Sequence, residues 1–490
     1  MNKIKSLASQ TALYGIPTIV GRLLNYFLVP LHTLIFSPQE FAPVAYFYAF
    51  VALLLIVFTH GMETTFFRFS SDSRTDKPKY YNYAFTSVLA VSGIVTIILI
   101  LASDGLASMA DYTGQGQIVR WLAAILFMDA VVSIPFAQMR LENKARKFAI
   151  TKMVNIILNI LFQLFFLLLL PKMAVSENSI FYDLASSIYN PDLGIGYIFL
   201  ANLLANVAMV AILWPYFSKV RLRLDSTSFK KMLAYSTPLL LTGVAGWFSE
   251  QFDKVLIRGF MSETDLGVYA QTFKLALLIQ LAVQAFRYAG EPFFFSNAKD
   301  KEAPQLFADV LYYFVIFAMI IFVCIGLNVD WIAELMLRRP EYRTALYIVP
   351  IIMMGKIFFG IYMNISMWFK IKDKTIYGTY FTVLGAVISI LGNTLLIPVL
   401  GITGSAITVL LVYSSMTIVC YRVGRNHFRV PYPIQSIGTY LITGSIIVWA
   451  SFQIRLDNSL LDAGFNILMA LIYCLTVWFI ERRKLAAKSL

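Results

Sequence analysis

The chain has 490 residues, of which 59% are hydrophobic and only 14% are charged, and its mean hydropathy is +0.72. This composition is far more apolar than that of an ordinary soluble domain and excludes a soluble globular protein. The net charge of +13 would suggest nucleic-acid binding in a soluble protein, but most Lys and Arg residues lie in loops between apolar segments, so we predict no nucleic-acid partner.

Apolar segments long enough to cross a membrane follow one another along the whole chain. A spanning helix needs about 20 predominantly apolar residues. The sequence predicts an all-α polytopic membrane protein with about fourteen transmembrane helices, at residues 11–36, 43–67, 81–103, 117–139, 148–170, 195–217, 233–259, 266–289, 306–328, 345–369, 376–397, 401–421, 437–453 and 463–480.

The basic residues alternate between the loops that join these segments. One set of loops contains most Lys and Arg residues, whereas the other set contains only Lys172, Arg338, Arg339, Arg343 and Arg455. Cytoplasmic loops carry such an excess of positive charge. We therefore expect a multi-pass protein of the bacterial inner membrane with both termini in the cytoplasm.

Two parts of the chain resemble each other. The segment from Lys231 to Leu239 aligns with that from Lys5 to Leu13, and Ser262–Ala270 aligns with Ser37–Ala45 after a one-residue gap. Six predicted spans separate the copies, so both halves enter the membrane in the same orientation, as in parallel repeats. The predicted organisation is an N-lobe of helices 1–6 (1–220), a C-lobe of helices 7–12 (221–430) and a C-terminal hairpin of helices 13–14 with a basic tail (431–490).

The sequence contains no recognisable site for a metal, a cofactor or catalysis. Cys324, Cys420 and Cys474 fall within predicted spans without metal or redox spacing, and the three His residues are scattered. No GxxxxGK[ST] motif occurs. External loops are short, the longest being about Pro171 to Gly194. We therefore predict no metal, no cofactor and no enzymatic activity.

Charged residues inside predicted spans are candidates for function, because a charge deep in lipid costs roughly 2.5–3.5 kcal/mol on insertion scales and normally faces a bundle interior or a wet cavity. Counting residues from the span ends places Arg22 and Lys356 near the midplane, one in each half, with Asp129 at similar depth. Asp129 can neutralise one of the two cations but not both. A midplane cation in each half predicts a site for an anion, with phosphate or pyrophosphate the natural candidate.

A second charged group lies around the predicted turn after the seventh span. Glu250, Asp253 and Lys254 share a helix face by their three- and four-residue spacing, and Glu250 to Lys254 is the favourable direction for an ion pair. Asp253 and Lys274 could meet across the hairpin. These four residues are either ion pairs that only orient helices or an outer switch that changes partners during transport.

Other polar residues complete the candidate site. Gln284 and Arg287 belong to a polar stripe along the eighth predicted span, and Asn25 follows Arg22 in the first. We expect Asn25, Gln284 and Arg287 to line a central cavity and to bind the substrate, with Asn25 and Gln284 contacting sugar hydroxyls. Glu63 and Arg68, near the inner end of the second span, form either a gate or a simple helix-end pair.

At these residues the chain resembles the bacterial polysaccharide flippases of the multidrug/oligosaccharidyl-lipid/polysaccharide exporter superfamily. The resemblance is carried by three groups of residues, namely Gly21-Arg22-Leu23-Leu24-Asn25 with Pro30-Leu31, Gly61-Met62-Glu63 with Phe67-Arg68-Phe69, and Asp253-Lys254-Val255-Leu256-Ile257 followed by Gly267-Val268-Tyr269. It implies two six-helix lobes around a cationic cavity, with alternating access by rocking of the lobes. In the lipid II branch, which has fourteen helices, it further implies that the last two helices form a groove for the lipid tail.

The resulting functional hypothesis is a flippase that moves an undecaprenyl-pyrophosphate-linked oligosaccharide, such as an O-antigen unit, from the cytoplasmic to the outer leaflet for cell-surface polysaccharide biosynthesis. Other glycan-assembly membrane proteins are its expected partners. Three alternatives are a lipid II flippase, a cation-coupled multidrug exporter of the same fold and a membrane glycan polymerase. The polymerase needs a catalytic external loop, and only Arg338-Arg339-Pro340-Glu341-Tyr342-Arg343 resembles one.

Overall fold

A computed structural model describes residues 20–21, 23–70, 77–177, 180–218, 220–221, 226–454 and 459–488. Within these ranges the chain is helical and contains no β-strand, as predicted. Eleven helices are long and apolar enough to cross a membrane, and a twelfth span is made by a pair of helices, Glu263–Ala276 and Leu278–Asn297, bent by 44°. The protein is therefore an all-α, multi-pass membrane protein.

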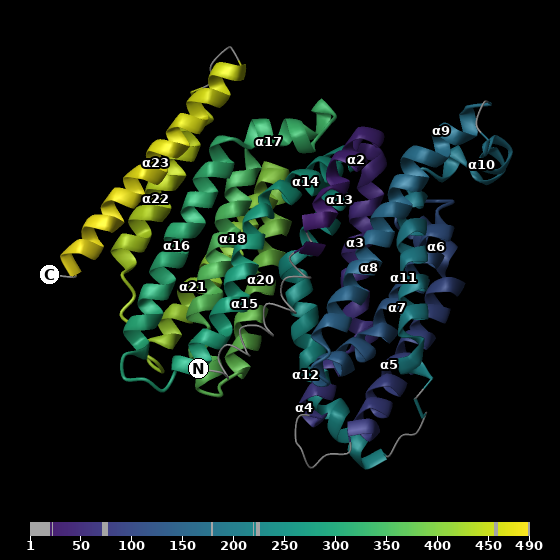
Figure 1. The fold of residues 1–490 in the computed structure, drawn as a ribbon, viewed down its shortest axis with the longest axis horizontal. Helices are drawn as coiled ribbons and strands as arrows, with labels where there is room; N and C mark the ends of the chain where they lie inside the picture. Colours follow the sequence, from purple (N-terminus) through teal and green to yellow (C-terminus); the bar gives the residue numbers. More distant parts are fainter. Residues whose placement is uncertain are drawn as a thin grey trace. The chain divides into compact units, whose positions relative to one another are not determined.

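The helices of the first half follow one another in the order shown in Figure 1. They are α2 (Leu28–Ile35), α3 (Pro38–Thr59), α4 (Met62–Ser70), α5 (Lys77–Leu101), α6 (Ser103–Met109), α7 (Gly116–Leu141), α8 (Ala145–Leu164), the π-helix η1 (Phe165–Leu169), α9 (Leu170–Val175), α10 (Tyr182–Ile188), the 3₁₀ turn η2 (Pro191–Leu193), α11 (Gly196–Phe217) and α12 (Ser226–Glu250).

The second half contains a similar series of long helices and short connecting turns. It comprises α13 (Phe252–Phe260), α14 (Glu263–Ala276), α15 (Leu278–Asn297), α16 (Ala303–Leu327), α17 (Val329–Met336), the 3₁₀ turn η3 (Pro340–Arg343), α18 (Ile348–Ile365), α19 (Met367–Ile371), α20 (Ile376–Leu400), α21 (Ile402–Gly424), α22 (Ile434–Ser451) and α23 (Ser459–Lys488).

The predicted count of fourteen spans is not confirmed, because two predicted segments do not qualify as full spans. The first is described only as a short apolar helix, Leu23–Ile35. The seventh is divided at Gln251 into α12 and α13, and α12 contains polar residues such as Lys230, Lys231 and Glu250 that lower its hydropathy. The other twelve predicted segments coincide with the eleven spans and the bent pair.

The chain divides into two compact units. Among the described residues, unit 1 contains Val29–Ala42 and all residues from Phe248 onward, whereas unit 2 contains the residues just before Val29 together with Pro43–Trp247. The first and seventh predicted segments each contribute residues to both units. The lobes 1–220 and 221–430 and the hairpin 431–490 were predicted from the internal repeat and stay predictions.

Unit 2 is held together by an aromatic core next to the break between α3 and α4. His60 and Gly61 have positive φ angles of 33° and 73°, which end α3 and start α4. A Cβ on Gly61 would lie 2.9 Å from Cβ of Leu239 and 3.1 Å from the Ser236 oxygen, so α12 approaches the turn too closely for a side chain. Phe58, Met62 and Phe66 follow the break into the buried core.

In unit 1 the turn η3 fixes α2. The Arg339 guanidinium donates hydrogen bonds to the carbonyl oxygens of Leu34 (3.3 Å) and Ile35 (2.7 Å), at the C-terminal end of α2. A cation at a helix C-terminus satisfies free carbonyls and interacts favourably with the helix dipole. The Tyr342 hydroxyl donates to the Phe36 oxygen at 3.1 Å. The segment considered as a catalytic loop therefore caps a helix.

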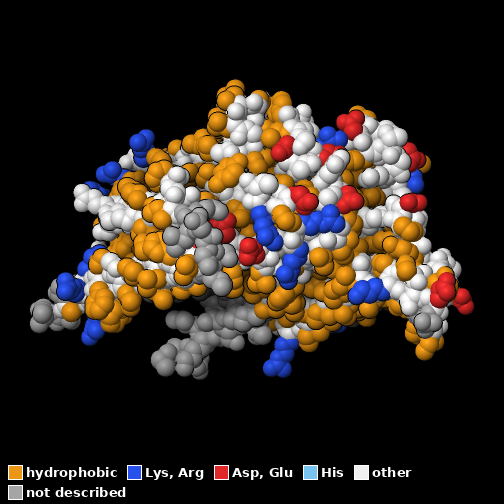
Figure 2. Space-filling view, turned by 90° about the horizontal axis from the view of Figure 1, so that it is seen from above, with side chains coloured by type: hydrophobic (Ala, Val, Ile, Leu, Met, Phe, Trp, Pro, Cys, Tyr) orange, Lys and Arg blue, Asp and Glu red, His pale blue; other side chains and the backbone are white. Residues whose placement is uncertain are grey.

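Large apolar side chains remain exposed along the long helices. Examples on one helix are Val383, Val387, Leu391 and Leu395 of α20, which are 45–66% exposed and recur every four residues. A soluble protein would bury such a stripe, so this face of α20 contacts lipid. Figure 2, which is seen from above the view of Figure 1, shows acidic and basic side chains among the hydrophobic ones at that end of the helices.

Candidate functional site

The seventh predicted segment changes direction where its charged residues lie. Helix α12 ends at Glu250, Gln251 has φ −130° and ψ −17°, and α13 starts at Phe252. The regular four-residue geometry that would bring Glu250 beside Lys254 is interrupted there. The structure instead connects Glu250 to Tyr413 of α21, whose hydroxyl donates to Glu250 Oε1 at 2.9 Å.

Asp253 is the centre of a buried hydrogen-bond network in unit 1. Its side chain is only 6% exposed. The Tyr269 hydroxyl donates to Asp253 Oδ2 at 2.6 Å, and the Ser405 hydroxyl donates to the Tyr269 oxygen at 2.9 Å. The Lys254 ammonium lies 3.4 Å from Asp253 Oδ1 and donates to Gln251 Oε1 at 2.9 Å. Asp253 thus connects α13 to α14 directly and to α21 through Tyr269. These hydrogen bonds and the nearby Lys254 ammonium satisfy its buried carboxylate.

Lys356 lies near this network, in the middle of α18, and is 4% exposed. Its ammonium nitrogen is 3.4 Å from the Tyr413 hydroxyl and lies over the rings of Tyr413 (4.8 Å to the centroid) and Phe273 (5.6 Å). Within the described residues no carboxylate oxygen comes within 4 Å of it. The arrangement leaves a buried cation stabilised by aromatic rings, without a direct counter-ion.

Other predicted residues of unit 1 lie apart from this network. Lys274 is placed over the Phe41 ring, 5.0 Å from its centroid, and forms no ion pair within the described part of the chain. Asp253 thus binds Tyr269 and Lys254, and not Lys274. Gln284 is 8% exposed on α15, and Arg287 of the same helix lines a separate pocket described below.

In unit 2 the charged residues have partners from other helices. Glu63 forms an ion pair with Arg140 of α7, whereas the Arg68 guanidinium lies 6.0 Å from the Tyr235 ring centroid. Asp129 Oδ1 accepts a hydrogen bond from the Asn206 amide at 3.0 Å. Arg140 belongs to the last turn of its helix, so the Glu63 pair ties two helix ends together.

The Asp129 side chain is part of a polar ladder between α7, α8 and α11. Asn155 donates to Asn206 Oδ1 at 3.1 Å, and Lys152 is close enough to interact electrostatically with Asp129. Asp129, which the sequence suggested as a counter-charge for Arg22 or Lys356, thus has partners of its own within unit 2. Of the residues predicted for substrate binding in the first segment, Asn25 is exposed, and Arg22 lies outside the described residues.

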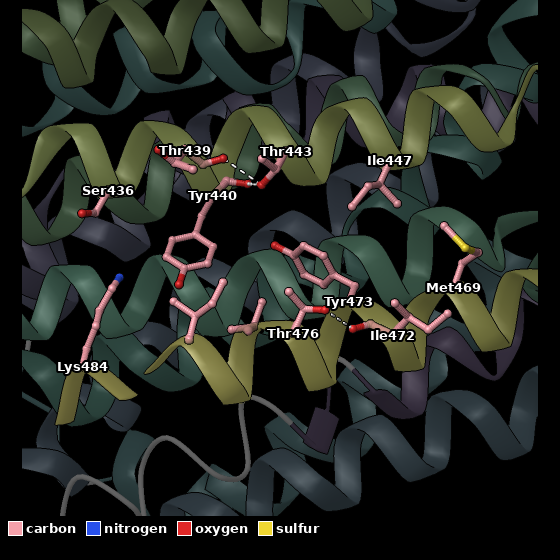
Figure 3. A pocket seen from close by; sticks show the side chains of 12 residues that line it. Ser436, Thr439, Tyr440, Thr443, Ile447, Met469, Ile472, Tyr473, Thr476 and Lys484 are labelled. Atoms are coloured by element: carbon pink, nitrogen blue, oxygen red, sulfur yellow. Dashed lines mark hydrogen bonds between the residues drawn. The ribbon is translucent and has the colours of Figure 1, made fainter. Parts of the chain in front are cut away.

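A groove runs between the last two helices, α22 and α23. Its volume is about 350 Å³. Figure 3 shows Thr439, Thr443 and Ile447 of α22 facing Tyr473 and Thr476 of α23. At one end the Glu481 carboxylate accepts hydrogen bonds from two tyrosine hydroxyls, those of Tyr312 and Tyr440, at 2.7 Å each. The groove is long, mostly apolar and bounded by a polar cluster.

Several residues of these sites carry no obvious sequence signal. Tyr269 and Tyr413 are two of 27 tyrosines, and their carboxylate partners are 16 and 163 residues away in the chain. The polar contacts of Asp129 could be anticipated in part from the sequence, because Asn206 and its neighbour Asn202 lie at helical spacing within the otherwise apolar span of α11. Within the described ranges, no group of three or more His, Cys, Asp or Glu residues could hold a metal ion.

Comparison with known families gives a direct match. The model of a family described as polysaccharide biosynthesis protein matches residues 33–189 and 192–289, just over half of the chain. The chain belongs to the polysaccharide biosynthesis protein family. The chain is also similar to a curated protein, the Lsg locus putative protein 1 of Haemophilus influenzae, with 22% identity over 306 residues, which cover 60% of this chain and 67% of that protein.

Solved structures share the fold of this family member. The lipid II flippase MurJ, in an inward closed conformation, superposes with a TM-score of 0.75 at 14% identity, over 97% of this chain and 99% of that one. An inward-facing multidrug resistance transporter of the MATE family and MOP superfamily gives 0.61 at 14% identity, over 89% and 99%. The family match confirms the predicted resemblance to a family of polysaccharide biosynthesis proteins, and these structures show that the chain has the fold of MurJ and of MATE transporters.

Proposed function

We propose that this protein is a flippase that moves an undecaprenyl-pyrophosphate-linked oligosaccharide from the cytoplasmic to the outer leaflet of the bacterial inner membrane, by alternating access. The observation that carries the proposal is Lys356, a buried cation with no carboxylate partner within 4 Å among the described residues. Such a charge is expensive in a membrane and marks a substrate pathway. Membership of the polysaccharide biosynthesis family supports a lipid-linked glycan as the cargo.

The chemistry of the cargo fits the charge. A pyrophosphate offers several anionic oxygens, and an ammonium group binds phosphate as a point charge. In the proposal, Lys356 and the predicted midplane residue Arg22 hold the pyrophosphate, while Asp253 neutralises Lys254 through their ion pair. The groove between α22 and α23 accommodates part of the polyprenyl chain.

A reconstitution experiment tests the proposal. Purified protein in liposomes is supplied with undecaprenyl-pyrophosphate oligosaccharide, and a membrane-impermeant glycan probe reports the leaflet of the sugar. We expect transfer by the wild type and a roughly ten- to hundredfold slower transfer by Lys356→Gln, because a hydrogen bond to a charged group contributes about 1.5–3 kcal/mol. The control is Lys374→Gln, which neutralises an exposed loop lysine. Equal rates for Lys356→Gln and the wild type would contradict the role of Lys356.

Lipid II is the second candidate cargo. Two observations favour it, namely the similarity of the whole fold to the lipid II flippase MurJ and the groove between the last two helices. Both lipids are carried on the same pyrophosphate chemistry, so Lys356 serves either. A competition experiment distinguishes the two cargoes. Excess unlabelled lipid II slows the transfer of the labelled oligosaccharide lipid only if the protein accepts both lipids.

The two remaining alternatives fit the observations less well. A cationic drug would meet the buried Lys356 charge on its path, which disfavours multidrug export. A polymerase would need free catalytic groups in the loop before α18, but Arg339 caps α2, and Arg343 donates to the Leu337 carbonyl oxygen at 2.8 Å and lies 3.8 Å from the Glu334 carboxylate.

A further inference from the structure

A small pocket inside unit 1 lies between α15 and the helices α18 and α19. Its polar lining residues are Arg287, Glu291, Asn364 and Lys370, and Phe286 and Phe294 belong to its apolar wall. The cavity measures about 20 Å³, which is enough for one water-sized group. The pocket is distinct from the network around Asp253 and Lys356.

Two buried polar atoms in this pocket have no hydrogen-bond partner within the described structure. They are Nε of Arg287, a donor, and Oδ1 of Asn364, an acceptor. Asn364 is only 5% exposed, and its amide nitrogen is already used by a bond of 3.0 Å to the Gly360 carbonyl oxygen. The amide orientation is therefore fixed, with its oxygen unpaired. A buried polar group without a partner is unfavourable, so both atoms favour a ligand group that pairs with them.

The pair of unsatisfied atoms restricts the chemistry of a ligand. A phosphate oxygen would accept from Arg287 but offers no hydrogen to Asn364, and a metal cation would bind Asn364 but be repelled by Arg287. A hydroxyl group donates one hydrogen bond and accepts another, so its chemistry matches the donor of Arg287 and the acceptor of Asn364. Its size also matches the cavity.

Two charged residues that line the pocket neutralise each other. Glu291 and Lys370 form an ion pair across it, with side chains 38% and 28% exposed. Because these two charges satisfy each other, Nε of Arg287 and Oδ1 of Asn364 remain the unpaired atoms that a ligand would meet. The walls formed by Phe286 and Phe294 offer apolar surface, which suits the C–H face of a sugar ring beside its hydroxyl.

We propose that this pocket binds one hydroxyl of the sugar attached to the pyrophosphate of the cargo, with the sugar ring outside it. We call it the hydroxyl subsite, defined by Arg287 and Asn364. The inference rests on the proposed function and deepens it, because it assigns recognition of the glycan to residues other than the pyrophosphate-binding Lys356.

The test compares two lipids in the full-length protein reconstituted in nanodiscs. Equilibrium binding is measured for bare undecaprenyl pyrophosphate and for the same lipid carrying one sugar, either N-acetylglucosamine or galactose. We expect the wild type to bind one sugar-bearing lipid about three- to tenfold more tightly than the bare lipid, since one hydrogen-bonded group contributes about 0.5–1.5 kcal/mol. Asn364→Leu should lower this ratio to about one without changing the affinity for the bare lipid.

A matched control variant is available in α20. Asn393 is also buried, also donates to the oxygen four residues earlier (2.9 Å to Ser389) and also leaves its Oδ1 unpaired, but it does not line the pocket. Asn393→Leu should leave the ratio unchanged. Asn364→Asp, which keeps an acceptor oxygen, should retain the preference. If Asn364→Leu does not fold, Arg287→Met makes the same test from the donor side.

The outcomes separate the two proposals. An unchanged ratio in Asn364→Leu, or a wild-type ratio of one for both sugars, overturns the hydroxyl subsite and leaves a buried water only. An equal loss of affinity for both lipids in Asn364→Leu also overturns the hydroxyl subsite, because the residue would then affect pyrophosphate binding or the fold. Wild-type protein that binds neither lipid overturns the proposed function itself, and the subsite with it.

Discussion

Tyrosine hydroxyl groups connect the carboxylates and cations of unit 1. Tyr269 binds Asp253 and accepts from Ser405, while Tyr413 binds Glu250 and lies beside the Lys356 ammonium. A hydroxyl both donates and accepts, so it links charged groups without adding a charge of its own. Tyr269 thus holds the Asp253 carboxylate, and Tyr413 lies between the Glu250 carboxylate and the Lys356 ammonium.

The hydrogen bonds that Tyr269 and Tyr413 donate to carboxylates should differ in their contribution to stability. Tyr269→Phe leaves Oδ2 of the buried Asp253 without its 2.6 Å partner, so we expect a loss of about 1–3 kcal/mol in the free energy of unfolding. Tyr413→Phe should cost less, about 0.5–1.5 kcal/mol, because water can replace the bond to the exposed Glu250. The contact of the Tyr413 hydroxyl with Lys356 is long, at 3.4 Å, and the Phe ring keeps the cation–π contact. Thermal unfolding in detergent measures both, with Tyr347→Phe, an exposed tyrosine, as control. A larger loss for Tyr413→Phe would contradict this ranking.

The sequence placed the charged residues of this network but not their partners. Spacing alone put Glu250, Asp253 and Lys254 near one another, and depth in the span singled out Lys356. The break at Gln251 changed which groups meet, because its φ of −130° interrupts the helical repeat. Tyr413 and Asn364 could not be selected, since tyrosines and amides in apolar spans are common and contacts across many residues leave no trace in a single sequence.

Among the elements, α2 depends most on contacts from a distant segment. It has only eight residues, which is too short for a helix to be stable by itself. Its end is held by Arg339, and the Thr33 hydroxyl donates to the Met336 carbonyl oxygen at 3.0 Å. The second half of the chain therefore determines how the first predicted span ends.

Removal of the cap should loosen this helix locally. Arg339→Ala frees the carbonyl oxygens of Leu34 and Ile35, and we expect a local loss of about 1–2 kcal/mol, seen as roughly five- to thirtyfold faster hydrogen exchange of the α2 amides. Mass spectrometry of peptides covering residues 28–36 measures it. The neighbouring Arg338→Ala is the control, because that side chain is exposed. Equal exchange in both variants would show that the cap does not hold α2.

Most spans were predictable because lipid imposes a long apolar stretch on each of them. The exceptions have polar residues for physical reasons that become visible only in three dimensions. Helix α12 contains Ser236, which is 2% exposed and donates at 3.2 Å to the Leu233 carbonyl oxygen. This hydroxyl is satisfied inside unit 2 and does not face lipid, whereas Lys230, Lys231 and Glu250 are exposed near the two ends of the helix, so hydropathy averaged over α12 underestimates it as a span.

At the scale of the whole molecule, the distribution of basic residues sets the orientation in the membrane. Short loops rich in Lys and Arg are retained in the cytoplasm during insertion. The loop after α19 contains Lys372 and Lys374, whereas the segment around α10 contains Asp183 and no Lys or Arg. These two loops should therefore lie on opposite sides of the membrane.

Cysteine labelling in intact bacteria tests this orientation. In a chain with Cys324, Cys420 and Cys474 replaced by Ala, we expect a membrane-impermeant maleimide to label the Ser187→Cys variant from outside. The Lys374→Cys variant should react only after permeabilisation. Both positions are exposed, so access depends on the side of the membrane. Labelling of the second variant in intact cells would reverse the proposed topology.

The cap on α2 also has a consequence for the order of events during synthesis. Thr33 and its acceptor at Met336 are 303 residues apart, and ribosomes add about 5–20 residues per second. About 15–60 seconds therefore pass between the synthesis of α2 and the arrival of η3. During that interval the C-terminal end of α2 lacks its contacts with Arg339 and Met336, so the helix stays uncapped until the ribosome is well into the second half of the chain.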